Sequence, residues 1–224
     1  MNRRPLPALF AAVLLALTAP AALPAAAPVA LPPPDTAGKL PLEQALATRR
    51  SRREFAPGGL SLAQVSQLAW AAQGVTSPDG KRTAPSARAV YPLVVYLVAN
   101  DVTGLPRGLY RYEPKAHALA PVASGDQGPG VAAATARQAF VAAAPLVFVV
   151  TGDSALAASK FGARAERWVA METGFVVQNI YLEATALGLG TVMVGGFDVA
   201  ALQRGLALPS GHEPYAVLPV GRRP

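Results

Sequence analysis

The chain alternates between short, almost wholly apolar runs and longer stretches in which apolar residues recur every three or four positions. Residues 93–99 and 145–151 are continuous apolar runs, which predict strands covered on both faces. Residues 108–112 alternate between apolar and polar positions, and residues 117–122 are suited to pair with them as a second strand. Two further strands are predicted at 191–194 and 215–220.

Helical periodicity predicts the remaining elements. One helix is expected over 41–48, and a second begins where Ser61 and Gln64 form a capping box. Others are predicted at 132–143, 163–187 and 198–206. The stretch 163–187 is apolar nearly all round, which predicts burial in the domain centre or in a subunit interface. Because strands and helices do not alternate regularly, the pattern favours an α+β fold over a doubly wound sheet.

The first residues have the pattern of an export signal. Two arginines precede an apolar segment at 6–17, and small residues with A-x-A spacing follow, so residues 1–27 are predicted to be a signal peptide. An uncleaved membrane anchor is the alternative, and the paired arginines also suit the twin-arginine route. Residues 28–40 are predicted to be a Pro/Ala-rich linker, and residues 41–224 a single domain. We therefore expect an exported, periplasmic protein with no stable membrane span after cleavage.

Composition narrows the chemistry. The chain carries a formal charge of +7, and loss of Arg3 and Arg4 with the signal leaves +5, an excess that favours anionic ligands or surfaces. There is no cysteine, which excludes iron–sulfur clusters, thiolate zinc sites and disulfides. The two histidines, His117 and His212, lie in polar or turn-like contexts and are predicted to be surface residues.

Several reaction classes lack the residues that they need. Neither the G-x-S-x-G motif of hydrolases nor a P-loop is present. Gly188 and Gly190 resemble the start of a dinucleotide fingerprint, but the third glycine position is Met193, and the pair follows a predicted helix. The acidic residues show no metal-ligand spacing with a histidine, so no metal site is predicted.

Three segments offer the groups that hold a flat, phosphorylated ligand. Residues 49–53 contain four arginines and a serine, and guanidinium forks beside a hydroxyl bind phosphate. Residues 83–92 form a loop rich in small side chains, which lets a flat ligand approach the backbone. Residues 194–198 place two glycines before a helix, which exposes backbone N–H groups. Each segment alone is also compatible with a role that involves no ligand: a solvated surface, an ordinary loop or a helix cap.

Together these segments resemble the FMN-dependent nitroreductase family, and within it the SagB-type dehydrogenases most closely. The resemblance extends from about 42 to 220, most of the mature chain. The matching segments, in order, are 49–55, 70–76, 82–87, 91–93, 108–112, 178–182 and 186–198. The resemblance implies an α+β homodimer with a mainly antiparallel central sheet flanked by helices, and with FMN in each of two clefts at the subunit interface.

The resemblance also implies the cofactor-binding residues. The FMN phosphate and ribityl chain would contact Arg49, Arg50, Ser51 and Arg53. The isoalloxazine ring would lie along Val194, Gly195 and Gly196. The other subunit would contribute Pro85, Ser86 and Ala87. Near the C-terminus the family often adds a basic residue at the phosphate, for which the candidates are Arg222 and Arg223.

The chain departs from the family pattern at three positions. Arg88 stands where the SagB-like branch usually has glycine, Ala89 replaces an asparagine of typical nitroreductases, and Gly195 takes the place of an acidic residue in some relatives. Because the flavin carries the chemistry, no catalytic side chain is predicted. Arg53, and second Arg88, are the candidates for stabilising the negative charge of reduced flavin; Arg88 also suits an anionic substrate.

We therefore predict an exported FMN-dependent oxidoreductase that works in two half-reactions on a small-molecule substrate. NAD(P)H is a cytoplasmic reductant, so the protein either uses another donor such as quinol, or oxidises a substrate and passes electrons to oxygen or a carrier. A non-catalytic flavin-binding carrier or sensor is an alternative. A basic module for polyanions is another, but no aromatics interleave with the arginines, so nucleic acid is not an expected partner.

Overall fold

The computed structural model describes residues 27–136 and 138–224, so residues 1–26 of the predicted signal peptide lie outside the described residues. The core is a seven-stranded sheet in the order β1-β6-β5-β3-β7-β9-β8, in which every neighbouring pair is antiparallel. Its strands are β1 Val29–Ala30, β3 Leu93–Ala99, β5 Gly108–Glu113, β6 Ala118–Ser124, β7 Leu146–Asp153, β8 Leu189–Thr191 and β9 His212–Arg222. A separate parallel pair joins β2 (Leu60–Ser61) to β4 (Val102–Thr103).

The continuous apolar runs form the centre of the sheet. Strands β3 and β7 pair along their whole lengths, and almost every residue in both is buried. Their side chains point to both faces, and helices cover both faces, which explains why the runs are apolar without alternation. The α+β fold with a central antiparallel sheet is therefore confirmed.

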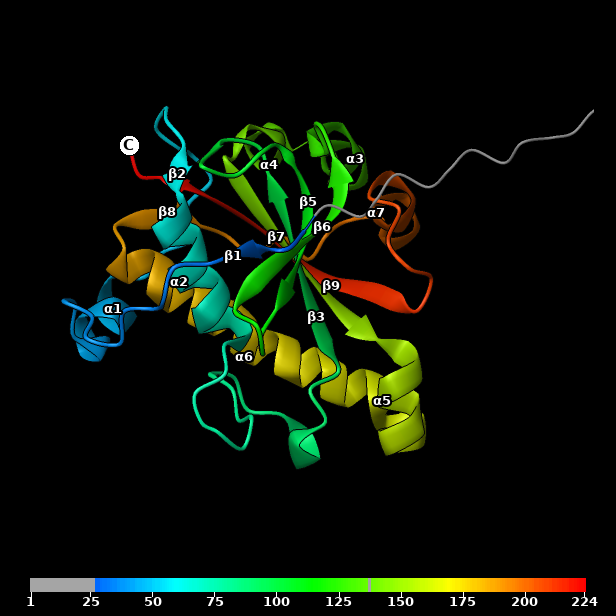
Figure 1. The fold of residues 1–224 in the computed structure, drawn as a ribbon. Helices are drawn as coiled ribbons and strands as arrows, with labels where there is room; N and C mark the ends of the chain where they lie inside the picture. The colour runs from blue at the N-terminus through cyan, green and yellow to red at the C-terminus, as the bar shows by residue number, and fades with distance from the viewer. Residues whose placement is uncertain (1–26, 137) are drawn as a thin grey trace, which may run out of the picture.

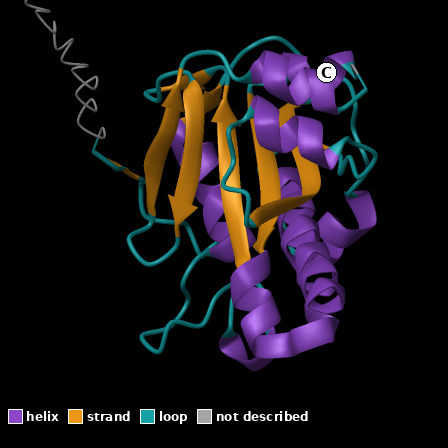
Figure 2. Ribbon diagram, turned by 90° about the vertical axis from the view of Figure 1, so that its right-hand side faces the viewer, coloured by secondary structure: helices purple, strands orange, loops and turns teal. Residues whose placement is uncertain are grey.

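Helices lie on both sides of the sheet (Figure 1). They are α1 Leu42–Thr48, α2 Leu62–Gln73, α3 Gly128–Ala134, α4 Ala139–Ala143, α5 Ser154–Phe161, α6 Ala165–Ala186 and α7 Val199–Gly205, with 3-10 turns at Ala87–Ala89 and Gly162–Arg164. One apolar cluster joins α2 and α6 to one sheet face, and a second joins α3, α4 and α7 to the other. Figure 2 shows the sheet between its helices in a view turned by a quarter.

The helix starts follow local side-chain chemistry. Ser61 and Gln64 make the predicted capping box at the start of α2, and the Asp198 carboxylate accepts the Ala201 N–H at the start of α7. Helix α6 spans 22 residues and buries one face on α2 and the sheet, while Met171 and Phe175 stay exposed. Only part of its apolar surface is therefore used within one chain.

Two predicted elements differ from the structure. The helix expected over 132–143 is two short helices, α3 and α4, because Ala136 adopts a positive φ of 52° that a helix does not allow. The strand expected over 191–194 lies earlier, at β8, and only Val194 returns to pair with Val217 of β9.

The segment expected to be a linker packs against the domain. Val29 and Ala30 pair with β6, and the Leu31 side chain is buried. The buried Gln67 amide forms two hydrogen bonds with the backbone of Asp35, each 2.9 Å long. Residues 28–40 are therefore docked along the fold, because their backbone groups find partners that a sequence pattern does not show.

Candidate functional site

The arginine-rich segment is fixed to the end of the sheet. Ser51 lies beside Thr191 on the outer side of β8, and the Arg52 N–H donates to the Thr191 carbonyl at 2.8 Å. The chain then crosses one sheet face over two glycines: a Cβ on Gly190 would stand 3.0 Å from Arg52 Cβ, and one on Gly221 would stand 2.7 Å from Phe55. The glycines of this end of the sheet therefore admit the segment itself.

Tyr181 of α6 connects this segment to the turn after β8. Its hydroxyl accepts the Met193 N–H at 2.7 Å and lies 3.2 Å from Ser51 Oγ. The Arg49 guanidinium lies over its ring, 5.0 Å from the centroid, in a cation–π contact. Tyr181 is only 8% exposed, so it contacts the two segments from the interior of the protein.

The arginines here are available to an anion. Arg50 donates only to the backbone carbonyls of Ala47 and Arg49, and Arg53 is exposed. The ion pairs within 27–136 and 138–224 are Lys81–Asp79 and Arg111–Glu113, and neither involves this segment. Guanidinium groups without carboxylate partners, beside the Ser51 hydroxyl, fit a phosphate.

The turn 194–196 presents backbone rather than side chains. Val194 is buried in the core and exchanges two backbone hydrogen bonds with Val217. Gly195 and Gly196 are exposed, and a Cβ on Gly196 would meet nothing within 4 Å. A flat ring can therefore approach this backbone closely.

The loop containing Pro85, Ser86 and Ala87 lies at the other end of α6. The Ala87 N–H donates to Glu172 Oε1 at 2.8 Å, and Glu172 precedes Tyr181 by nine residues. At the rise of an α-helix that separation is about 13 Å along the axis. A single chain thus divides the predicted cofactor residues into two groups at opposite ends of one helix.

The C-terminal arginines have separate roles. Arg223 donates to the carbonyls of Leu189 and Thr185, at 2.8 and 3.3 Å, and so closes the end of α6. The Arg222 side chain packs against Gly58, where a Cβ would stand 3.3 Å from its guanidinium nitrogen. The structure places Arg222 against Gly58 rather than against Ser51.

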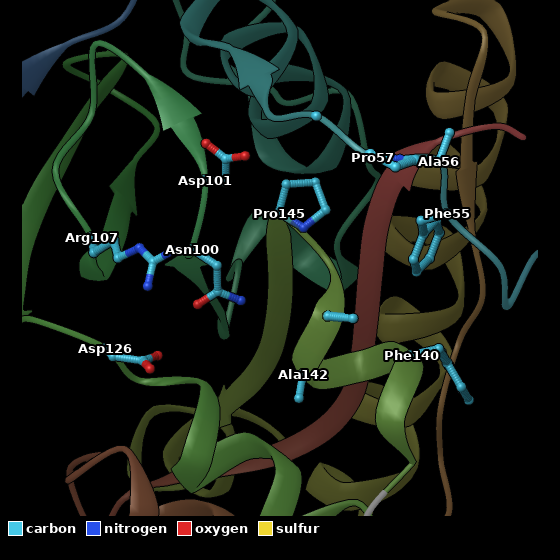
Figure 3. A pocket seen from close by; sticks show the side chains of 12 residues that line it. Phe55, Ala56, Pro57, Asn100, Asp101, Arg107, Asp126, Phe140, Ala142 and Pro145 are labelled. Atoms are coloured by element: carbon cyan, nitrogen blue, oxygen red, sulfur yellow. The ribbon is translucent and has the colours of Figure 1, made fainter.

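A cavity of about 410 Å³ lies elsewhere, beyond the end of β3 (Figure 3). Phe55 and Phe140 line one side, and the polar lining residues are Asn100, Asp101, Arg107 and Asp126. The Asn100 Oδ1 atom is buried without a hydrogen-bond partner among the described residues. The cavity includes none of the predicted cofactor-binding residues.

The histidines differ from the sequence expectation. His117 is half-buried, between the Tyr112 hydroxyl at 2.9 Å and Ser66 Oγ at 2.8 Å. His212 lies 2.7 Å from the Tyr96 hydroxyl, and burial lowers the pKa of its ring. The surface assignment was wrong because Ser66 and Tyr96, two of their partners, lie 51 and 116 positions away along the chain. The buried Ser66 hydroxyl also donates to the Pro32 carbonyl, at 2.6 Å.

Two residues that organise the site were not identified from sequence. Glu172 and Tyr181 both lie on the buried side of α6. Glu172 could have been found from its position in the helical repeat, because its neighbours on the same helix face, Val169 and Val176, are core residues.

Among the residues described, no group of three or more His, Cys, Asp or Glu is arranged to hold a metal ion. The described helices include none with the length and apolar character that crossing a bilayer requires.

Comparisons with known proteins identify the family of the chain. The family model described as the nitroreductase family matches residues 46–222. A protein of Methanocaldococcus jannaschii that bears the name nitroreductase is 39% identical over 185 residues, which are 83% of this chain and 92% of that protein. A crystal structure from Ralstonia eutropha JMP134, also described as a nitroreductase, superposes with a TM-score of 0.78 at 32% identity, over 88% of this chain and 90% of the other.

A more distant structure shows the same fold. The NADPH:FMN oxidoreductase of Vibrio harveyi, solved with NAD+, has a TM-score of 0.58 at 18% identity, over 81% of this chain and 68% of that one. The family match covers most of the chain, and the M. jannaschii and R. eutropha relatives match over nearly their full lengths. This chain therefore belongs to the nitroreductase family of flavin-dependent oxidoreductases.

Proposed function

We propose that this protein is an exported oxidoreductase that binds FMN in two clefts between two copies of the chain. The FMN phosphate would contact Arg49, Ser51 and Arg53, and the ring would lie along Gly195 and Gly196. Bound FMN supplies two-electron redox chemistry in two half-reactions. Two observations support FMN as the cofactor. The V. harveyi protein, which shares the fold, is an NADPH:FMN oxidoreductase, and the arginine segment offers guanidinium and hydroxyl donors to a phosphate.

The observation that carries this proposal is the contact made by Tyr181. Its hydroxyl ties Ser51 to the Met193 backbone, and the exposed glycines follow directly. Groups suited to a phosphate and groups suited to a flat ring therefore lie on one continuous surface. The Arg53 charge favours the reduced, anionic form of a flavin held there.

The second copy is proposed from the exposed side of α6. Met171 and Phe175 are 45% and 42% exposed, and Leu42 and Leu46 of the adjoining α1 are 59% and 51% exposed. An apolar strip of this kind favours a protein interface. A twofold axis near Phe175 would bring the Tyr181 end of one helix to the Glu172 end of the other. The two groups of predicted cofactor residues would then meet.

Export and direction belong to the same proposal. The apolar segment at 6–17 and the A-x-A spacing that follows it support export. In that location the donor is a quinol or an oxidisable substrate rather than a nicotinamide nucleotide. The resemblance to SagB-type dehydrogenases supports substrate oxidation, with electrons passed to oxygen or a carrier.

The test uses the mature chain, purified and then titrated with FMN and with riboflavin. We expect a yellow protein that bleaches with anaerobic dithionite, and that binds FMN much more tightly than riboflavin because only FMN has the phosphate. Ser51→Ala should weaken FMN binding about tenfold or more and leave riboflavin binding unchanged. A colourless protein that takes up neither compound would overturn the proposal. A yellow protein that no acceptor reoxidises would favour the carrier alternative.

A further inference from the structure

Glu172 is a buried acid in an unusual setting. Its side chain is only 2% exposed and lies in the N-terminal half of the longest helix. Oε1 accepts the Ala87 N–H at 2.8 Å, whereas Oε2 is enclosed and has no hydrogen-bond partner among the described residues. Burying a carboxyl group with one oxygen unpaired is unfavourable, so the contact with Ala87 calls for an explanation.

The loop that Glu172 holds is itself strained. Arg88, Ala89 and Tyr91 have positive φ values of 55°, 54° and 53°, a region that residues with a Cβ seldom adopt. The Ser86 hydroxyl accepts the Tyr91 N–H at 2.8 Å, across the same turn. Such strain persists only where surrounding contacts enforce it, and it concentrates at functional sites. Glu172 and Ser86 both accept backbone N–H groups of this loop, from Ala87 and Tyr91.

The position of this contact relates it to the cofactor. Glu172 reaches the loop from α6, and Tyr181 reaches the arginine segment from the same helix. A rigid helix therefore sets the distance between the loop and the surface proposed to hold the phosphate. In a twofold dimer, the loop of one copy would face the flavin surface of the other.

We propose that Glu172 is a positioning residue, which holds the Pro85–Ala87 loop in the shape that completes the flavin cleft of the partner subunit. This inference rests on the proposed function. Glu172 touches neither substrate nor flavin, and it acts through the Ala87 N–H. Removing it leaves the partly buried Ala87 N–H without its acceptor and releases a loop whose backbone prefers another conformation.

The first test compares Glu172→Ala, Glu172→Gln and the control Glu166→Ala, which removes an exposed acid from the same helix. Arg88 in the loop is an exposed trypsin site, so cleavage after Arg88 reports loop release without any flavin. We expect Glu172→Ala to be cleaved about tenfold faster and to bind FMN about tenfold more weakly. Glu172→Gln keeps an acceptor oxygen and should stay within about twofold of wild type in both measurements.

Equal behaviour of Glu172→Ala and Glu166→Ala in the trypsin assay would overturn the inference, whatever the flavin result. Failure of the wild type to bind FMN would instead overturn the proposed function. Should Glu172→Ala not fold, Ala87→Pro removes the same N–H from the loop side, and the extended Ser86 (ψ 140°) tolerates a following proline. Ala87→Pro should lose FMN affinity to the same extent.

The second test asks which subunit the loop serves. One protomer carries Arg49→Ala with Ser51→Ala, the other carries Glu172→Ala, and mixed dimers are isolated by two affinity tags. If the loop acts on its partner, both defects fall in one cleft and the other is intact, so the mixed dimer binds one FMN with wild-type affinity. Each homodimer binds none at that affinity. A mixed dimer without such a site would overturn the inference.

Discussion

The two ends of helix α6 organise their surroundings by different means. At one end the Tyr181 hydroxyl has two polar neighbours, Ser51 and the Met193 N–H, and the Arg49 guanidinium covers its ring. At the other end the Glu172 carboxyl has one hydrogen bond, to Ala87, and an unpaired oxygen. One helix thus positions two segments. Tyr181, at one of them, has partners for its hydroxyl, whereas Glu172, at the other, has one carboxyl oxygen without a hydrogen-bond partner in the part of the chain that the structure describes.

The difference follows from the hydrogen-bonding capacity of the two groups. A phenol both donates and accepts, so Tyr181 can join two segments without any charge. An ionised carboxyl only accepts, so Glu172 needs a second donor or a proton for its free oxygen. The Tyr181 end is therefore expected to be insensitive to pH, and the Glu172 end to respond to it.

Separation of the two proposed copies should have the strongest consequence for cofactor binding. Phe175→Glu places a charge in the middle of the exposed strip, between the two ends of α6. Because each cleft would lose the residues from its partner, we expect a monomer by light scattering and at least a hundredfold loss of FMN affinity, about 2.8 kcal/mol.

Val122→Glu is the matched control, since Val122 is 45% exposed but belongs to β6, at the far side of the sheet from β8. It should leave both the mass and the affinity unchanged. A Phe175→Glu protein that remains dimeric, or a monomer that keeps its FMN, would contradict the interface proposed for α6.

The next change removes only the Tyr181 hydroxyl. Tyr181→Phe leaves the Met193 N–H without its acceptor and Ser51 without its neighbour. We expect unfolding to become easier by about 1–3 kcal/mol, and FMN binding to weaken about tenfold. Denaturant unfolding of the apo-protein and fluorescence titration with FMN measure the two effects.

Tyr215→Phe is the control for this change, because the Tyr215 hydroxyl makes only a long 3.5 Å contact with Glu213. Its two values should stay close to those of the wild type. Were both phenylalanine variants to behave alike, Tyr181 would not be the link between the arginine segment and the turn.

Glu172 and Tyr181 should also differ in how their contributions to stability depend on pH. Burial raises the pKa of the Glu172 carboxyl above its ordinary value of 4.5, and the neighbouring Ala87 N–H and Ser86 side chain oppose the shift. The folded protein therefore retains this proton at a pH where the unfolded chain has released it. Stability from this group is fully present below 4.5 and is lost as the pH rises through the folded-state pKa.

Glu172→Gln has no proton to lose at this position. We therefore expect its melting temperature to approach that of wild type near pH 4.5, and to exceed it by a growing margin toward neutral pH. Tyr181→Phe should show a difference from wild type that stays constant over the same range. A constant difference for Glu172→Gln as well would mean that the carboxyl does not titrate differently in the folded state.

Much of the fold could be predicted because it is encoded locally. The run 93–99 coincides with β3, and the caps at Ser61 and Asp198 lie where their side chains meet the backbone three residues on. The break at Ala136 was missed because alanine favours helix and nothing in the local pattern marks its positive φ.

The candidate site was predictable in its residue types and not in its connections. The arginine segment predicts an anionic ligand from its composition alone. Its attachment to the sheet could not be predicted, because Ser51 pairs with Thr191, 140 residues further along the chain. Gly190 was compared with a dinucleotide fingerprint, whereas in the structure the absence of a side chain at Gly190 leaves room for the Arg52 side chain. Such long-range contacts depend on packing, which periodicity does not report.

The smallest expected effect concerns Arg88, at the tip of the loop that Glu172 holds. Its guanidinium is exposed and makes one long contact, 3.4 Å to the Lys160 carbonyl, so its charge is available at the edge of the proposed cleft. Screened by solvent, one exposed charge changes the attraction of an anionic acceptor by about 0.5–1 kcal/mol. We expect Arg88→Ala to raise KM about two- to fivefold for an anionic quinone sulfonate, and to leave KM for the neutral parent quinone unchanged.

Salt separates this effect from a change in loop shape. Raising the ionic strength to 0.5 M, where the Debye length is about 4 Å, should remove the difference between Arg88→Ala and wild type for the anionic acceptor. Arg88→Lys keeps the charge and should match wild type at low salt. Equal losses with both acceptors would instead mean that Arg88 acts through the loop conformation. The substitution would then resemble Glu172→Ala, since Arg88 directly follows Ala87, whose N–H donates to Glu172.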